Sequence, residues 1–207
     1  MAVSRETQWS REYKNKDGGD CFLDSRFRDG SASITLVQLK HDWTDWQDHE
    51  KIDFAQSFVH YRGRHRTKIL RFLIVNGDHN VWSAIAASVA ISLSAEESVP
   101  FLSGCSETCD IGRGANYFQA LSLTGSPEAV NVLRPCLERI WESPDLLEAE
   151  PFCNFTAFDA IWCIDALFRL GEPLDSLRDR YETLKTHPSM GEDVMKWLSG
   201  HFEQRKA

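Results

Sequence analysis

Apolar residues recur at helical spacing along most of the chain, and the alternation typical of β-strands is rare. The clearest case is the segment 128–141, where apolar residues take every third or fourth position and polar residues occupy another face. The apolar stripe comprises Val130, Leu133, Leu137, Ile140 and Trp141. This pattern predicts an amphipathic helix that buries one face and exposes the other.

The stretch ALSLTGSPEAVNVL at 120–133 contains both a helix stop and a helix start. Gly125 can take a positive φ at little steric cost, which ends the preceding helix. Ser126 is a good N-cap, and Pro127 suits the first helical position because no amide is needed there. Pro135 removes one backbone hydrogen bond inside the second helix and predicts a bend. The stretch therefore predicts a two-helix hairpin.

Two other segments resemble this hairpin. AISLSAEESVPFL at 90–102 aligns with 120–133 at an offset of 30 or 31, and ALFRLGEPLDSL, from Ala166, repeats the turn glycine and proline at an offset of 46. Ser94 with Glu97 predicts a capping box, and Asn154 is placed to cap the next helix. That helix contains AFDAIWCIDALF, which is apolar nearly all round, so we expect it to be central.

The ends of the chain give weaker patterns. Residues 1–30 have few apolar positions, and we expect a loop or a partly ordered N-terminal arm. SITLVQL at 33–39 is ambiguous between strand and helix. A stripe from Met190 to Phe202 predicts a terminal amphipathic helix.

The repeated hairpins resemble the HEAT-like repeats found in phycobilin lyases, whose consensus is ALxxLGDPEAVPxLxxAL; ALSLTGSPEAVNVLRPCLERI is the closest match. The resemblance implies an all-α fold, an α-solenoid of antiparallel helix pairs that forms a single domain over residues 31–207. It also implies that the second helix of each pair lines a concave partner-binding surface. On this sequence that surface would include Asn131, Arg134, Glu138, Arg178 and Glu182.

Charge is distributed unevenly along the chain, whose net charge is −8. Residues 1–71 hold 13 Lys and Arg against 11 Asp and Glu, whereas residues 72–207 hold 10 against 20. A negative surface repels phosphate backbones and attracts basic proteins, so nucleic acid is disfavoured as a partner of the larger part. No apolar run approaches the roughly 20 residues that span a bilayer, and the N-terminus lacks a signal-peptide core, so we expect a cytoplasmic protein.

The six cysteines form no CxxC pair, and several lie among apolar neighbours. We interpret them as reduced core residues and expect neither a zinc site nor another cofactor. Asp159 and Asp165 are unusual in so apolar a helix. A buried carboxyl with a raised pKa would be a catalytic candidate, but we favour a carboxylate that accepts hydrogen bonds from the amides of a neighbouring turn.

A basic cluster lies in YRGRHRTKILRF at 61–72. It either contacts phosphates or an acidic partner, or forms a solvated face that pairs with the acidic residues at 42–53, and we favour the second interpretation. Its anion-contact candidates are Arg62, Arg64, Arg66, Lys68 and Arg71.

Trp43 and Trp46 lie among charged residues in HDWTDWQDHE. Tryptophans are mostly core residues, but amphipathic ones recur as anchors of interfaces, so both remain candidate partner contacts.

Together these features predict a non-catalytic protein-binding module, an adaptor, regulator or immunity-like inhibitor whose partner has a basic surface. One alternative is a nucleic-acid-binding protein of the HEAT-like DNA glycosylase kind, which would use the cluster at 62–71. A second alternative is a bilin-lyase-like enzyme, for which the sequence offers no identifiable catalytic residue.

Overall fold

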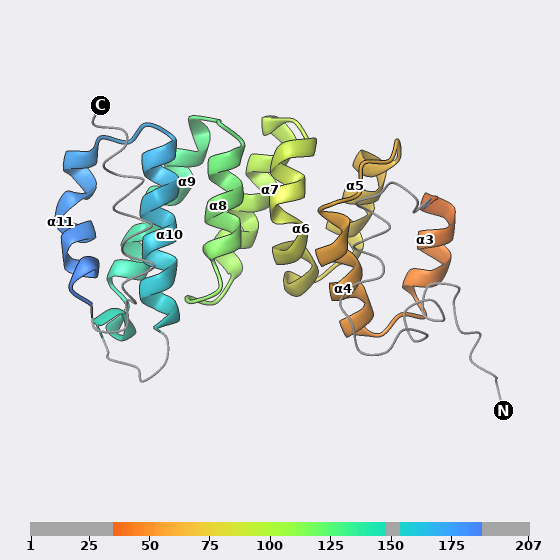
Figure 1. The fold of residues 1–207 in the computed structure, drawn as a ribbon, viewed down its shortest axis with the longest axis horizontal. Coiled ribbons are helices and arrows are strands. Elements are labelled where there is room, and N and C mark those ends of the chain that lie inside the picture. The colour runs from red at the N-terminus through yellow and green to blue at the C-terminus, as the bar shows by residue number, and fades with distance from the viewer. Residues whose placement is uncertain (1–34, 148–153, 188–207) are drawn as a thin grey trace. The chain divides into compact units, whose positions relative to one another are not determined.

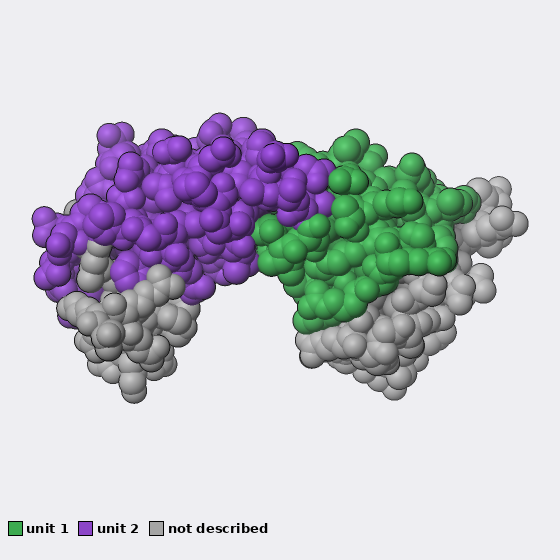
Figure 2. Space-filling view, turned by 90° about the horizontal axis from the view of Figure 1, so that it is seen from above, with its two compact units in different colours: residues 1–92 green, residues 93–207 purple. Residues whose placement is uncertain are grey.

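The computed structural model describes residues 35–147 and 154–187 of the 207-residue chain. Within these ranges the protein is all-α, with nine α-helices, one short 3-10 helix and no strand, so the predicted fold class is confirmed at that level. The chain divides into two compact units, residues 1–92 (unit 1) and residues 93–207 (unit 2), which are described separately (Figure 2).

Unit 1 contains four described helices, and α6 packs against both α4 and α5. Its buried core includes Phe54 and Phe58 from α4, Ile69 and Leu73 from α5 and Ile85 from α6, and all five are at most 1% exposed. The helices are α3 (Leu36–Trp43), α4 (Asp48–Phe58), α5 (Arg66–Asn76) and α6 (His79–Ser92).

The described part of the ambiguous segment 33–39 is helical. Thr35 is the N-cap of α3, and its hydroxyl accepts a hydrogen bond from the amide of Gln38 at 3.2 Å. Leu39 and Trp43, one turn apart, are both buried, so a capped start and a helical apolar spacing outweigh the β-branched residues.

Unit 2 contains five described α-helices, and α10 is central to them. It packs against α8, α9 and α11, while α7 packs against α8 and α9, and Figure 1 shows α8 and α10 side by side. Ten of the fifteen residues of α10 are buried, which confirms the central position predicted from its apolar composition. The elements are α7 (Ala95–Thr108), α8 (Ala115–Leu123), α9 (Glu128–Trp141), η1 (Pro144–Leu147), α10 (Phe155–Arg169) and α11 (Leu174–Lys185).

The predicted turn chemistry is confirmed at both hairpins. Gly125 and Gly171 have φ values of 63° and 91°, in the left-handed region that favours glycine at the end of a helix. The start of α9 differs by one position, because Pro127 is the N-cap while the Ser126 hydroxyl accepts from the amide of Glu128 at 3.3 Å. Pro135 lies inside α9 as predicted.

Of the two helix caps predicted in unit 2, one is confirmed and the other is not. Asn154 caps α10 as predicted, since its side-chain oxygen accepts from the amide of Ala157 at 2.9 Å. The predicted capping box at Ser94 is wrong in its hydrogen bonding. Ser94 is the N-cap of α7, but its hydroxyl donates to the carboxylate of Glu97 at 3.4 Å and does not accept from an amide.

The predicted N-terminal arm at 1–30 and the predicted terminal helix around 190–202 lie outside the described residues. The single repeat domain over 31–207 and its solenoid arrangement stay predictions.

Candidate functional site

Charged side chains connect α9 to the segment around α11 on the exposed surface of unit 2. Arg134 on α9 forms an ion pair with Glu172 at 2.7 Å, and Glu138 on α9 forms one with Arg180 on α11 at 2.6 Å. The Arg180 guanidinium also lies over the Trp141 ring, 5.4 Å from its centroid. These contacts fix the spacing of charges across two helices. We call this surface the α9–α11 face, and its members are Asn131, Arg134, Glu138, Glu172, Arg178, Arg180 and Glu182.

All five residues that the resemblance assigned to a binding surface are exposed. Arg178 pairs with Asp175 at 3.0 Å and Glu182 with Lys185 at 3.6 Å, both within α11. Such exposed pairs contribute little stability, so their charges remain available to a partner.

Sequence reasoning missed Glu172 and Arg180. A signal for Arg180 was present, because the repeat offset of 46 places it at the position equivalent to Arg134. Glu172 gave no such signal, since its pairing depends on how the turn before α11 approaches α9.

The Arg66 guanidinium, at the centre of the predicted basic cluster, donates hydrogen bonds to other groups of unit 1. It donates to the backbone carbonyls of Phe58, Val59 and Tyr61 and lies over the Phe58 ring. From the same group, Nε donates to the Ser92 hydroxyl at 2.8 Å and Nη2 to the Ser88 hydroxyl at 2.9 Å. Burial lowers the pKa of Arg66, and the nearby Arg62 lowers it further. Arg66 therefore joins the loop between α4 and α5 to α6.

The other four members of the basic cluster are exposed. Arg62 donates to the carbonyl of Val59 at 3.3 Å, so it approaches the same loop as Arg66. The Nε of Arg64 donates to the Nε2 of His65 at 3.2 Å. Lys68 and Arg71 follow on α5. The cluster is therefore divided: the Arg66 guanidinium makes internal contacts, and the other four side chains are exposed to solvent.

Trp43 and Trp46 are only 5% and 7% exposed. Their rings lie 5.8 Å apart, and the Trp46 ring is 5.3 Å from that of Phe54. The Trp43 indole also donates to the carbonyl of Asn76 at 3.2 Å. These contacts support the core interpretation of both tryptophans over the interface interpretation.

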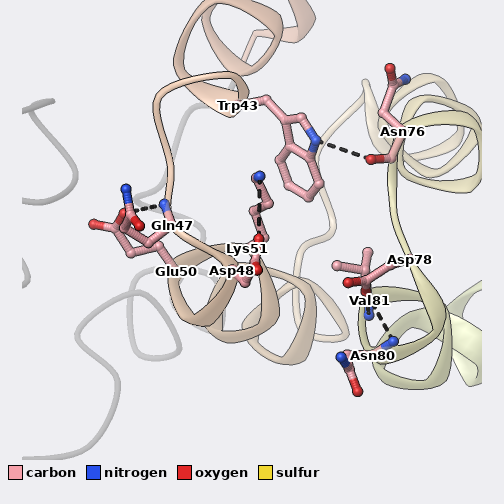
Figure 3. A network of polar contacts seen from close by, with 9 residues as sticks. All are labelled: Trp43, Gln47, Asp48, Glu50, Lys51, Asn76, Asp78, Asn80 and Val81. Atoms are coloured by element: carbon pink, nitrogen blue, oxygen red, sulfur yellow. Dashed lines mark hydrogen bonds and ion pairs between the residues drawn. The ribbon is translucent and has the colours of Figure 1, made fainter.

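A small pocket in unit 1, which the sequence did not indicate, lies between α4 and the start of α6. Figure 3 shows the polar contacts of residues around it. Its volume is about 200 Å³. Lys51 lies 3.7 Å from the Asp48 carboxylate and 5.8 Å from the centroid of the Trp43 ring. Asp78 accepts from the amides of Asn80 and Val81, which caps α6. The lining residues are Asp48, Lys51, Asn76, Gly77, Asp78 and Val81.

Asp159 on α10 is 1% exposed and holds the loop between α7 and α8. Its carboxylate accepts from the backbone amides of Gly112 at 2.8 Å, Gly114 at 2.9 Å and Ala115 at 2.9 Å. Burial raises the pKa of Asp159, and the three amides with Arg139 offset part of that rise. The prediction that this carboxylate accepts from the amides of a neighbouring turn is confirmed.

Asp165, the second buried carboxylate of α10, is 2% exposed and pairs with Arg169 one turn later at 2.7 Å. The predicted acceptance from the amides of a neighbouring turn does not describe Asp165, whose partner is the Arg169 guanidinium. Both buried carboxylates of α10 thus have a structural partner.

The four cysteines in the described ranges are free thiols, and three of them are buried. Burial raises the pKa of the Cys105 thiol to about 12, and it also raises the pKa of Cys109, Cys136 and Cys163. Within the described residues, no group of three His, Cys, Asp or Glu is placed to hold a metal ion.

We expect Cys105 to react far more slowly with iodoacetamide in the native protein than in the denatured chain. A pKa of about 12 in place of 9.0 leaves roughly a thousandfold less thiolate at pH 8. Peptide mapping by mass spectrometry after timed labelling checks this, with the same peptide from urea-denatured protein as the control. Equal labelling rates in the two states would contradict the burial of this thiol.

The described residues thus define an all-helical protein in which two ion pairs link α9 to the segment around α11. Comparison of the chain with family models, curated proteins and solved structures finds no match. None of the helices in the described ranges is long and apolar enough to cross a membrane.

Proposed function

We propose that this chain is a non-catalytic protein-binding module, an adaptor, regulator or inhibitor that recognises a basic surface. The observation that carries the proposal is the α9–α11 face, whose exposed charges are held at defined spacing by ion pairs between α9 and the segment around α11. It belongs to unit 2, which has 10 Lys and Arg against 19 Asp and Glu, a formal charge of −9. Such a field attracts basic partners and speeds their association.

The proposed architecture of unit 2 is a short HEAT-like stack in which α8 with α9 and α10 with α11 form successive pairs. Three features support it. Gly125 and Gly171 occupy equivalent turns with positive φ. The first helices of the two pairs, α8 and α10, pack together. The second helices are connected through Glu138 and Arg180. In this arrangement the second helices present the recognition surface.

Binding is better supported than catalysis, because the two buried carboxylates that raised the question each have a structural role. Binding of nucleic acid has less support for a similar reason. Arg66, in the middle of the basic cluster, is occupied by loop carbonyls and serine hydroxyls and is not directed at a phosphate.

Charge reversal on the α9–α11 face tests the proposal. Glu138→Lys and Glu182→Lys are each expected to weaken binding to a basic partner about tenfold, because each replaces an attraction with a repulsion. The partner is obtained by affinity capture with the wild-type chain, purified, and titrated by isothermal calorimetry at two salt concentrations. Its affinity should fall as salt rises.

Glu96→Lys makes the same charge change on an exposed residue of the first turn of α7 and serves as the matched control. The proposal fails if the captured partner is acidic, if its affinity does not depend on salt, or if the control variant weakens binding as much as the two test variants.

A further inference from the structure

The helices α8 and α10 begin at the same end of unit 2 (Figure 1). Two large apolar side chains are exposed near these helix starts. Ile111, in the loop between α7 and α8, is 37% exposed, and Phe155, the first residue of α10, is 63% exposed. The loop touches the start of α10 directly, because a Cβ added to Gly112 would lie 2.9 Å from the Cβ of Phe155. We call these two residues and their surroundings the Ile111–Phe155 patch.

Hydrogen bonds to a buried carboxylate hold the backbone of the loop beneath the patch. Gly112, next to Ile111, has a φ of 92°, and the Asp159 carboxylate accepts the amides of Gly112, Gly114 and Ala115. Burying a carboxylate costs free energy unless donors compensate it, so the fold uses one buried charge to hold this loop. A surface held in one conformation loses little entropy on binding, which favours its use as a docking site.

Two exposed aspartates lie near the patch along the chain or through one backbone contact. Asp110 precedes Ile111 in the loop, and the carbonyl of Asp145 accepts from the side-chain amide of Asn154, which places η1 beside the start of α10. Neither carboxylate forms an ion pair with another residue of the described ranges. Arg113 is the one cation in the loop 109–114, within a unit whose formal charge is −9.

From these observations we propose that the Ile111–Phe155 patch docks a basic segment of a partner protein, one with a large apolar side chain flanked by Lys or Arg. The apolar side chain covers Ile111 and Phe155, and the flanking cations meet Asp110 and Asp145. Aromatic side chains are enriched in protein interfaces, whose rim is polar. This inference rests on the proposed function and adds to it a second contact and a chemical class of ligand.

A second copy of the chain is a poorer occupant. In a symmetric dimer through this patch, the same carboxylates of both copies would approach each other without a compensating cation. Like charges placed against each other oppose association. The charge of the patch therefore selects a basic partner over self-association.

Synthetic peptides test the patch independently of any captured partner. The probe is an 11-residue peptide in which one Leu is flanked by two Lys on each side. Its matched controls replace the four Lys with Glu, or the Leu with Ser. We expect ¹H–¹⁵N spectra of the full chain to show chemical-shift changes at Ile111, Gly112 and Phe155 with the first peptide only.

Substitutions then show which side chains of the patch contribute to the affinity for the peptide. Phe155→Ser and Ile111→Ser should each weaken binding of the Lys–Leu peptide at least fivefold, because each removes apolar area from the contact. Leu123→Ser is the matched control, since Leu123 is 48% exposed at the far end of α8. It should change the affinity less than twofold. Circular dichroism verifies that all three variants keep the wild-type helix content.

Several outcomes would overturn the inference. They are equal binding of the Lys and Glu peptides, unchanged affinity in both serine variants of the patch, or a dimer that dissociates when Phe155 is replaced. A captured partner separates the two proposals. If Glu138→Lys weakens its binding and Phe155→Ser does not, the docking role of the patch is wrong while the proposed function stands. If Phe155→Ser weakens it about fivefold or more, the patch is supported whichever result Glu138→Lys gives.

Discussion

Asp159→Asn is expected to lower the free energy of unfolding of unit 2 by about 3 kcal/mol, since it leaves buried amides without an acceptor. Both carboxylate oxygens are in use, one by Gly112 and Gly114 and the other by Gly114 and Ala115. Asparagine offers one oxygen and an amide group that cannot accept, so at least one backbone N–H loses its partner. Urea denaturation followed by circular dichroism measures the change.

Asp110→Asn is the matched control, because it removes a carboxylate from the held loop at an exposed position. It should change the free energy of unfolding by less than about 0.5 kcal/mol. Hydrogen exchange locates the effect, since the amides of Gly112, Gly114 and Ala115 should lose protection first in the Asp159 variant. An Asp159→Asn protein with wild-type stability and unchanged protection would refute the structural role of this carboxylate.

Local signals in the sequence were enough to predict much of unit 2. Gly125 and Gly171 end helices with positive φ, and Asn154 caps α10, because turn and cap residues act over three or four positions of the chain. The buried acceptor role of Asp159 was also predictable, since a carboxylate in an apolar helix requires donors. What the sequence did not give was the identity of those donors, which lie 44 to 47 positions away.

Features that depend on how distant elements meet were missed. The pairing of Glu138 with Arg180 joins residues 42 positions apart, and its geometry follows from the packing around α10. Trp43 and Trp46 could not be assigned to core or interface from their charged neighbours, because burial depends on the placement of Phe54 and Phe72. The basic cluster was equally ambiguous, since composition does not distinguish an internal guanidinium from an exposed one.

Arg66 is the residue at which that ambiguity can be resolved by experiment. Arg66→Ala is expected to lower the free energy of unfolding of unit 1 by about 3 to 4 kcal/mol, because it leaves loop carbonyls and the hydroxyls of Ser88 and Ser92 without their donor. It also removes the cation from the Phe58 ring. Arg66→Lys should give an intermediate loss, because an ammonium has three donors and cannot reproduce the planar fork of a guanidinium.

Lys68→Ala is the control, since Lys68 is exposed two residues later in the same cluster and should change stability by less than about 0.5 kcal/mol. Hydrogen exchange of the α4–α5 loop and α6 assigns any loss to unit 1. An anion-binding role makes the opposite prediction. Arg66→Ala would then keep wild-type stability and weaken binding of a duplex oligonucleotide, with a smaller salt dependence than the wild type. That result would restore the nucleic-acid alternative, whereas a destabilised unit 1 assigns Arg66 to the architecture and leaves recognition to the α9–α11 face of unit 2.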